Sequence, residues 1–236
     1  MLELLFEDRD LIVVYKPVGI ESQSSRGFAA DMVSEIKRHI HNLSPADRDP
    51  YVGVIHRLDK PVSGVMVYAK TKKAAAALSR QVANGEIQKR YFAVLCGKPV
   101  DNVDNFVDYL LKDGKTNTSR IVDKGITDAK RAELCCRVLE TAEVEPYGEL
   151  TLAEIELLTG RHHQIRVQMA GHGLPLWGDS KYNPLFAARA GRSDADVALA
   201  ACSLTFCHPV TGKTMTFYHA PTGKIFQNFQ RHSGEV

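Results

Sequence analysis

The chain has 236 residues, of which 44% are hydrophobic and 25% are charged, a composition typical of soluble globular proteins. Its net charge of +2 does not by itself indicate nucleic-acid binding, which needs positive charge gathered on one surface. No apolar run approaches the ~20 residues of a membrane span, and the start lacks the basic segment of a secretory signal. Five cysteines without a Cys-x-x-Cys pair favour reduced thiols and a cytoplasmic location.

Hydrophobic patterning predicts a strand at 11–15 and then a helix at about 27–43, where Phe28, Met32, Ile36 and Ile40 recur every four residues. A loop is expected at 44–50 and a strand at 62–69. Thr71 is the expected N-cap of a helix at 72–83, which Asn84-Gly85 ends.

The second half is predicted to be rich in strands. In chain order the expected elements are strands at 91–95, 105–111, 129–139 and 150–158, a helix at 161–172, strands at 198–206 and 213–219, and a short helix at 224–231. Because many strands follow one another with few alternating helices, the predicted fold class is α+β with a mixed, largely antiparallel sheet. One domain is expected over residues 1–236.

The segment His56-Arg57-Leu58-Asp59-Lys60 places a carboxylate among three cationic residue types, just before a Ser63-Gly64 turn and an apolar run. Nearby positive charge favours the ionised carboxylate. With no second acid in the motif, an ionised Asp59 suits a nucleophile better than a general acid. The motif alone leaves open the alternative of a surface turn with a local ion pair.

A second cluster follows the strand predicted at 150–158. The helix expected at 161–172 begins Arg-His-His, and its residues His162 and Arg166 lie four apart and share one face. A helix start that carries several donors suits an anion such as phosphate. The alternative is an ordinary solvated basic face, with His163 bonded to a backbone carbonyl.

Together these stretches resemble the RluA family of RNA pseudouridine synthases. The matching pieces occur in the family's order and span most of the chain: Lys16-Pro17-Val18-Gly19, His56-Arg57-Leu58-Asp59 with Ser63-Gly64, Lys89-Arg90-Tyr91, the segment 160–167, Gly178-Asp179 with Tyr182, and His208-Pro209. The Arg-Leu-Asp and His-Gln-Ile-Arg motifs are highly specific in combination. The resemblance implies a pseudouridine-synthase-like α+β fold, with flanking helices and loops and a central active-site cleft. Many relatives also carry an N-terminal S4 RNA-binding domain; none is expected here, because the first predicted core strand begins within the first fifteen residues.

The resemblance further implies a reaction and a set of roles. Such enzymes detach uracil from C1′ of its ribose, rotate it and rejoin it through C5, with no redox step, cofactor or metal. Asp59 corresponds to the family's catalytic aspartate, Arg166 to the arginine that pairs with it, and Tyr91 to the tyrosine that stacks on the target base. Base flipping is expected to involve Arg57. Substrate binding is expected of Arg57, Arg161, His163 and Gln164.

The expected partner is structured RNA, either ribosomal or transfer RNA, because family members with similar cores modify either. Six cations fall within twenty residues around Gly114 and Gly125. We expect this segment to contact RNA phosphates, whereas an ordinary solvated hairpin is the alternative. Its residues are Lys112, Lys115, Arg120, Lys124, Lys130 and Arg131. A monomer without membrane or metal partners is expected.

Three positions depart from the family pattern. The polar segment 21–25 replaces the usual His-Pro, His162 replaces a common Thr or Ser, and Leu199-Ala200-Ala201 replaces Leu-His-Ala. None of them is Asp59, Tyr91 or Arg166, so they bear on substrate choice more than on chemistry.

Other functions are less well supported by the sequence. A zinc site would draw on His162, His163, His172 and Asp179, but the metalloprotease His-Glu-x-x-His spacing is absent. A glycoside hydrolase needs two carboxylates, and only Asp59 has a motif around it. A non-catalytic RNA-binding protein would keep the basic residues and would not need Asp59.

Overall fold

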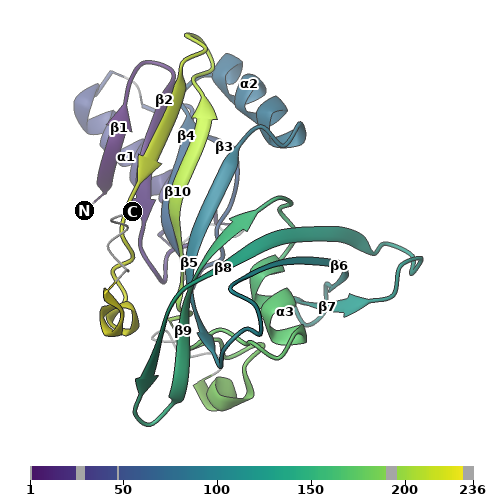
Figure 1. Ribbon diagram of the computed structural model, residues 1–236. Helices are drawn as coiled ribbons and strands as arrows, with labels where there is room; N and C mark the ends of the chain where they lie inside the picture. Colours follow the sequence, from purple (N-terminus) through teal and green to yellow (C-terminus); the bar gives the residue numbers. More distant parts are fainter. Residues whose placement is uncertain (1, 25–29, 47, 190–195, 231–236) are drawn as a thin grey trace. The chain divides into compact units, whose positions relative to one another are not determined.

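The computed structural model describes residues 2–24, 30–46, 48–189 and 196–230 (Figure 1). The chain divides into two compact units, which are described separately. The first comprises Met1–Gln88 and Ala201–His219, and the second comprises Lys89–Ala200 and Ala220–Val236. The single domain over residues 1–236 stays a prediction.

The first unit is built on a sheet in the order β1-β2-β4-β10, with β11 beside β10 and β3 beside β4. The pairs β1-β2, β2-β4, β3-β4 and β10-β11 are antiparallel. Every residue of β2 and β4 is buried, which is why the sequence of each is dominated by an apolar run. The bounds are β1 Glu3–Glu7, β2 Leu11–Lys16, β3 Gly53–Val54, β4 Ser63–Ala69, β10 Leu199–Cys207 and β11 Thr214–Tyr218.

Two capped helices accompany this sheet. Helix α2 (Lys72–Ala83) begins as predicted, because the Thr71 hydroxyl accepts a hydrogen bond from the backbone N–H of Ala74 at 3.1 Å. Helix α1 (Met32–Leu43) begins later than predicted, because Asp31 is extended and caps it. The predicted start at 27–29, including Phe28, lies outside the described residues.

The apolar face of α2 packs on the sheet of the first unit. Ala74 and Leu78 are fully buried and lie in one core cluster with residues from three strands. The strand residues of that cluster are Leu11, Val13, Val65, Val67, Ala69, Leu204 and Phe206.

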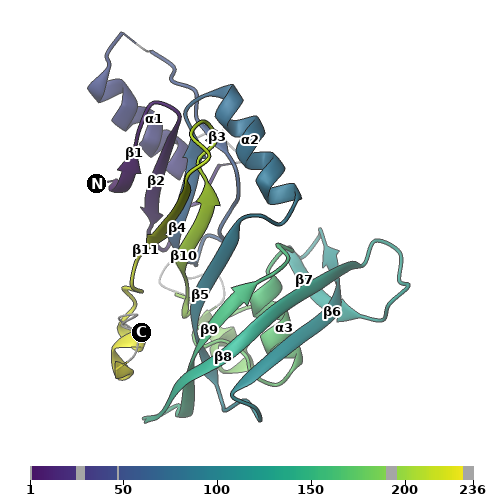
Figure 2. The same cartoon turned by 45° about the horizontal axis from the view of Figure 1, so that its top comes forward.

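The second unit holds an antiparallel sheet in the order β5-β9-β8-β6-β7, with helix α3 (Gln164–Gly171) against β6 and β7 (Figure 2). Leu110, Ala132 and Val167 form the core beneath this helix. The bounds are β5 Gln88–Cys96, β6 Val103–Asp113, β7 Thr118–Val122, β8 Lys130–Val144 and β9 Gly148–Leu157, with two 3-10 helices, η1 Pro184–Arg189 and η2 Lys224–Asn228.

The α+β class and the largely antiparallel sheet are confirmed. The predicted helix at 161–172 is wrong at its start, because His163 has a left-handed φ of 53° and residues 161–163 form a turn before α3. His162 therefore does not share a helix face with Arg166. The last helix is 3-10 and ends at Asn228, and its predicted end at Arg231 lies outside the described residues.

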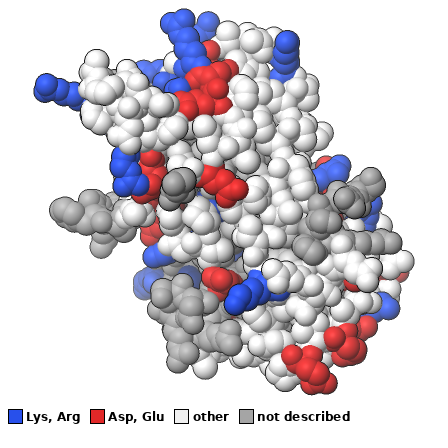
Figure 3. Space-filling view, turned by 90° about the vertical axis from the view of Figure 1, so that its left-hand side faces the viewer, with Lys and Arg blue, Asp and Glu red and all other residues white. Residues whose placement is uncertain are grey.

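None of the helices in the described part of the chain is long and apolar enough to cross a membrane. On the face seen in Figure 3, Lys and Arg side chains alternate with Asp and Glu, and neither sign dominates. A strongly basic face is thus absent from that view, in keeping with the small net charge.

Candidate active site

Asp59 lies on the irregular segment that precedes β4 in the first unit. Its backbone carbonyl accepts a hydrogen bond from Val62 N–H at 3.0 Å, which closes a tight turn into the strand. Its side chain is half-buried, whereas those of Arg57 and Lys60 are exposed. The turn thus carries one partly shielded carboxylate between two solvated cations.

Lys16, at the end of β2, supports this turn from below. Its side chain is fully buried, and its Nζ donates to the carbonyls of Pro17 at 3.0 Å, Ile20 at 2.7 Å and Lys60 at 3.3 Å. Burial lowers the pKa of Lys16 to about 8, although the Asp59 carboxylate opposes the shift. A buried ammonium thus ties two loops together and adds positive charge beside Asp59.

Ser22 holds the same turn from another side. Its buried hydroxyl donates to the carbonyl of Leu58 at 2.8 Å and accepts from the N–H of Leu58 at 3.0 Å. The hydroxyl of Tyr68, which is itself fully buried, donates to the carbonyl of Ser22 at 3.0 Å. The residue next to Asp59 is therefore fixed through both of its backbone polar groups.

Ser63 and Gly64 begin strand β4 and do not form the turn that the sequence predicted. Gly64 pairs with Lys16 across β2 and β4 and has a φ of +138°. A Cβ placed there would lie 2.5 Å from the backbone N and O of Ala201. Only glycine allows β4 and β10 to approach this closely beside the Asp59 turn.

Arg166 lies in the first turns of α3 in the second unit and forms a buried, two-pronged ion pair with Asp179. Nε donates to Oδ2 and Nη2 to Oδ1, each at 2.7 Å, and the two side chains are 4% and 0% exposed. Asp179 also accepts the N–H groups of Lys181 and Tyr182. The guanidinium lies over the ring of Tyr182, 5.3 Å from its centre.

The predicted catalytic residues fall in both units. Tyr91 is a buried residue of β5, opposite Ile155 of β9, and belongs with Arg166 to the second unit, whereas Asp59 belongs to the first. The pairing of Arg166 with Asp59 and the central cleft therefore stay predictions. What the second unit establishes is that Asp179 fixes the orientation of Arg166.

Gln164 organises the turn before α3. Its side-chain Nε2 donates to the carbonyl of Glu133 at 3.0 Å, and its Oε1 accepts from the Thr159 hydroxyl at 2.8 Å and from Arg161 N–H at 2.9 Å. Arg161 is exposed and also donates through Nε to the carbonyl of Arg131. His163 is buried, and Nδ1 of its ring lies 2.7 Å from the hydroxyl of Tyr182. Substrate contact by these three residues stays a prediction.

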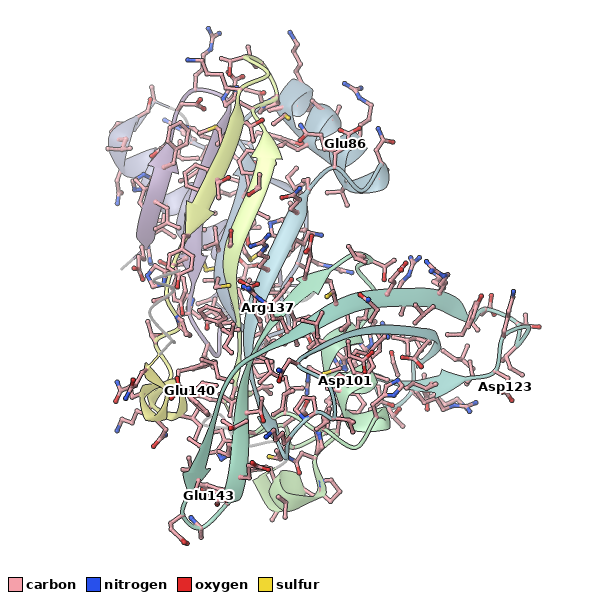
Figure 4. All side chains as sticks on the ribbon, in the orientation of Figure 1. Glu86, Asp101, Asp123, Arg137, Glu140 and Glu143 are labelled. Carbon is pink, nitrogen blue, oxygen red and sulfur yellow. The ribbon has the colours of Figure 1, made fainter. Side chains whose placement is uncertain are left out.

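The predicted RNA-binding segment forms the end of β6, all of β7 and the loop that leads to β8. Lys115, Arg120 and Lys124 are all exposed, and Asp123, at the far end of β7, is labelled in Figure 4. Both the RNA-contact hypothesis and the solvated-hairpin alternative predict exposed cations. The choice between them depends on RNA-binding measurements.

The residues of the alternative zinc site have other partners. His172 Nε2 lies 3.0 Å from Asp108 Oδ2, and Asp179 is engaged by Arg166. Among the described residues there is no group of three or more His, Cys, Asp or Glu side chains arranged to hold a metal. These contacts weigh against a zinc site at this place.

A shallow groove of about 260 Å³ lies on the sheet of the second unit. Two of its lining residues, Cys135 and Arg137, alternate along β8 with the buried Leu134 and Cys136, so these two face away from the core under α3. The other lining residues are Arg90, Val103, Glu154 and Glu156. Arg137, labelled in Figure 4, donates to Glu154 at 2.9 Å, and Arg90 lies 3.9 Å from the same carboxylate. The charges there are compensated, and none of the predicted catalytic residues lines the groove.

The supporting roles of three residues, Lys16, Asp179 and Ser22, were not predicted from the sequence. Lys16 lies in the Lys-Pro-Val-Gly segment and Asp179 in the Gly-Asp pair that match the family. These motifs marked both positions but did not predict which residues they contact. Ser22 lies in a segment that stood out only as a departure from the family pattern. Its task became visible only in its two bonds to Leu58.

Comparison with known proteins identifies the family of the chain. The model of the RNA pseudouridylate synthase family matches residues 10–171. An uncharacterized RNA pseudouridine synthase of Bacillus subtilis is 35% identical over 90% of this chain and 66% of its own length. A ribosomal large subunit pseudouridine synthase D of Zymomonas mobilis is 34% identical over 90% of this chain and 67% of its own length.

A more distant relative is a tRNA pseudouridine synthase C of Pectobacterium carotovorum, 29% identical over 92% of this chain and 58% of its own length. The chain thus spans about two thirds or less of the length of these three relatives. Among solved structures, human RNA pseudouridylate synthase domain containing 4 has a TM-score of 0.73 at 21% identity and covers 98% of this chain and 91% of its own. The match over most of the chain, at this level of identity, shows that the chain belongs to the RNA pseudouridylate synthase family and bears out its resemblance to the RluA family.

Proposed function

We propose that this chain converts a specific uridine of structured RNA to pseudouridine, with Asp59 as the nucleophile. The reaction breaks the bond from C1′ to N1 and forms one from C1′ to C5; N1 gains a proton and C5 loses one, so no oxidant is needed. The observation that carries the proposal is the Asp59 turn, which Lys16 and Ser22 hold in place in a member of this family. Such fixed positioning is what a nucleophile needs.

In this proposal Arg166, oriented by Asp179, pairs with Asp59, while Tyr91 stacks on the target base. Arg57 is exposed next to Leu58, where it can enter the base stack as the uridine is flipped out. Arg161, His163 and Gln164 bind the substrate around the start of α3. The two units act as one catalytic domain, as a monomer in the cytoplasm, without metal or organic cofactor.

The RNA is either ribosomal or transfer RNA, since the names of relatives include both a ribosomal large subunit enzyme and a tRNA enzyme. Pseudouridine mapping across all RNAs of a strain that lacks this protein would identify the uridine. If that strain loses no pseudouridine from any RNA, the proposal is wrong.

The decisive test is tritium release from RNA that contains 5-tritiated uridine, because forming the new bond at C5 expels that hydrogen. Asp59→Asn should fold normally and lose turnover to below about a thousandth of wild type. Asp49→Asn, an exposed carboxylate on the same unit, is the control that should remain active. Activity should persist in EDTA. Turnover by Asp59→Asn above that limit would remove Asp59 from the nucleophile role.

The competing function is RNA binding without catalysis. It predicts that wild type and Asp59→Asn bind RNA equally well and that neither releases tritium from any RNA. The proposed function predicts equal binding with release only by wild type.

A further inference from the structure

The β6–β7 hairpin carries exposed cations, and its second strand, β7, is hydrogen-bonded to the turn before α3. Hairpin residues 114–117 form the connection, and Asn117 has a left-handed φ of 51°. The backbone carbonyl of Asn117 accepts a hydrogen bond from Lys181 Nζ at 2.8 Å, which adds another exposed cation to this surface. The cations of this surface are Lys112, Lys115, Arg120, Lys124 and Lys181.

His162 joins the turn to the hairpin through both ring nitrogens. Nδ1 lies 2.9 Å from the hydroxyl of Ser119, and Nε2 lies 3.1 Å from Oδ1 of Asn117. An amide oxygen only accepts, so Nε2 donates to Asn117, and in the neutral ring Nδ1 accepts from Ser119. A protonated ring donates to both oxygens, so these contacts are compatible with either charge state.

Two further contacts hold β7 on the same side. The N–H of Ser119 donates to the hydroxyl of Tyr182 at 2.8 Å. Ile121 packs so closely on α3 that a Cβ at Gly171 would lie 2.4 Å from its Cδ1 atom. Residues 117, 119 and 121 alternate along the hairpin, so one face of it is fastened to the turn and the helix.

We propose that His162 is a positioning residue that fixes the β6–β7 hairpin so that its cations meet the phosphates of the RNA substrate. This inference rests on the proposed function. A threonine at position 162 would have a single, shorter polar group and could not reach both Ser119 and Asn117, which the two ring nitrogens of His162 contact. A hairpin held in its binding conformation loses less conformational freedom when RNA binds, so His162 contributes to affinity rather than to the chemical step.

The test compares His162→Thr with wild type by hydrogen exchange of the amides in 114–122 and by RNA affinity and turnover. Removing two hydrogen bonds of ordinary strength should speed exchange in the hairpin about tenfold and weaken RNA binding about five- to tenfold. The value of kcat at saturating RNA should stay within about twofold, and the salt slope of binding should be unchanged, because every phosphate-contacting cation remains.

Two other variants make the result specific. Asn117→Gly keeps the left-handed backbone, removes one partner of His162, and should show the same changes in smaller measure. The matched control is His172→Thr, which removes an imidazole bonded to Asp108 of β6 at the opposite end of α3 and should leave exchange in 114–122 unchanged.

Unchanged hairpin exchange in both His162→Thr and Asn117→Gly would overturn the fastening role. Faster exchange with unchanged RNA affinity would overturn the RNA-facing role of the hairpin. A wild-type protein that binds structured RNA but never forms pseudouridine would overturn the proposed function alone, because exchange and binding are measured without turnover.

Discussion

The buried ion pair between Arg166 and Asp179 makes Asp179→Asn a sharp test of how the site is supported. The substitution preserves shape but leaves the guanidinium, in a side chain 4% exposed, without the carboxylate that accepts two of its N–H groups at 2.7 Å. Removing one partner of a buried pair costs about 3–5 kcal/mol. For a chain of 236 residues each kcal/mol lowers Tm by about 2–4 °C, so we expect a drop of about 6–20 °C.

Thermal and urea unfolding followed by circular dichroism measure this change, and tritium release measures its effect on catalysis. Turnover should fall even below the new Tm, because the carboxylate that orients Arg166 is gone. The exposed pair of Asp49 with Lys37 provides the control, since Asp49→Asn should cost less than about 1 kcal/mol. If the free energy of unfolding of Asp179→Asn is within about 1 kcal/mol of that of wild type, then the ion pair with Asp179 does not fix Arg166 in solution as it does in the structure.

Three further predictions concern the Asp59 turn and the RNA surface. Ser22→Ala should lower kcat more than it raises KM and should lower the free energy of unfolding by about 2–4 kcal/mol, because both backbone groups of Leu58 lose a buried partner. Ser34→Ala, at an exposed position, is the control. Equal behaviour of the two variants would show that the hydrogen bonds of Ser22 to Leu58 do not support the Asp59 turn. The pKa of Lys16 is about 8 in the folded protein, against an ordinary 10.5, so between pH 8 and 10.5 the unfolded chain binds more protons than the folded one. The free energy of unfolding of wild type should therefore rise relative to that of Lys16→Met as the pH rises from 7 to 10. If urea unfolding shows the same pH dependence for both proteins, this prediction is wrong. Replacing the exposed Lys115, Arg120 and Lys124 together with Ala should weaken RNA binding and leave kcat nearly unchanged. The slope of log affinity against log salt concentration should fall by about one for each phosphate that is no longer neutralised. An unchanged slope in a filter-binding titration would show that the segment is an ordinary solvated hairpin.

The elements that could be predicted from sequence are those whose local pattern and tertiary setting agree. Strands β2 and β4 are wholly buried and are apolar except for Lys16 at the end of β2 and Ser63 at the start of β4, and α2 has a capping threonine at one end and Asn-Gly at the other. β7 could not be predicted, because three of its five residues are polar and show no alternation with apolar ones, and because contacts with α3, far along the chain, hold it in place. The start of α3 was missed because nothing local signals a left-handed histidine.

The candidate site shows the same division. The residue types around Asp59 suggested ionised-carboxylate chemistry, and the matching motifs named Arg166 and Tyr91. The contacts that support them depend on partners distant in sequence. Ser22 reaches Leu58 across 36 residues, and Lys16 reaches the carbonyl of Lys60 across 44. The spacing of residues along the chain does not predict such long-range contacts, so the supporting residues can be identified only from the three-dimensional structure.

The path of the chain also has a consequence for biosynthesis. β10 lies next to β4 and supplies Leu204 and Phe206 to the core of the first unit, yet all of residues 89–200 leave the ribosome before most of it does. Any sheet that β1, β2 and β4 form before then would leave unpaired the edge of β4 that β10 later occupies, and such an edge is open to mispairing with other nascent chains. A premature stop codon near position 200 would therefore disable the Asp59 turn, although every residue of that turn would already have been made.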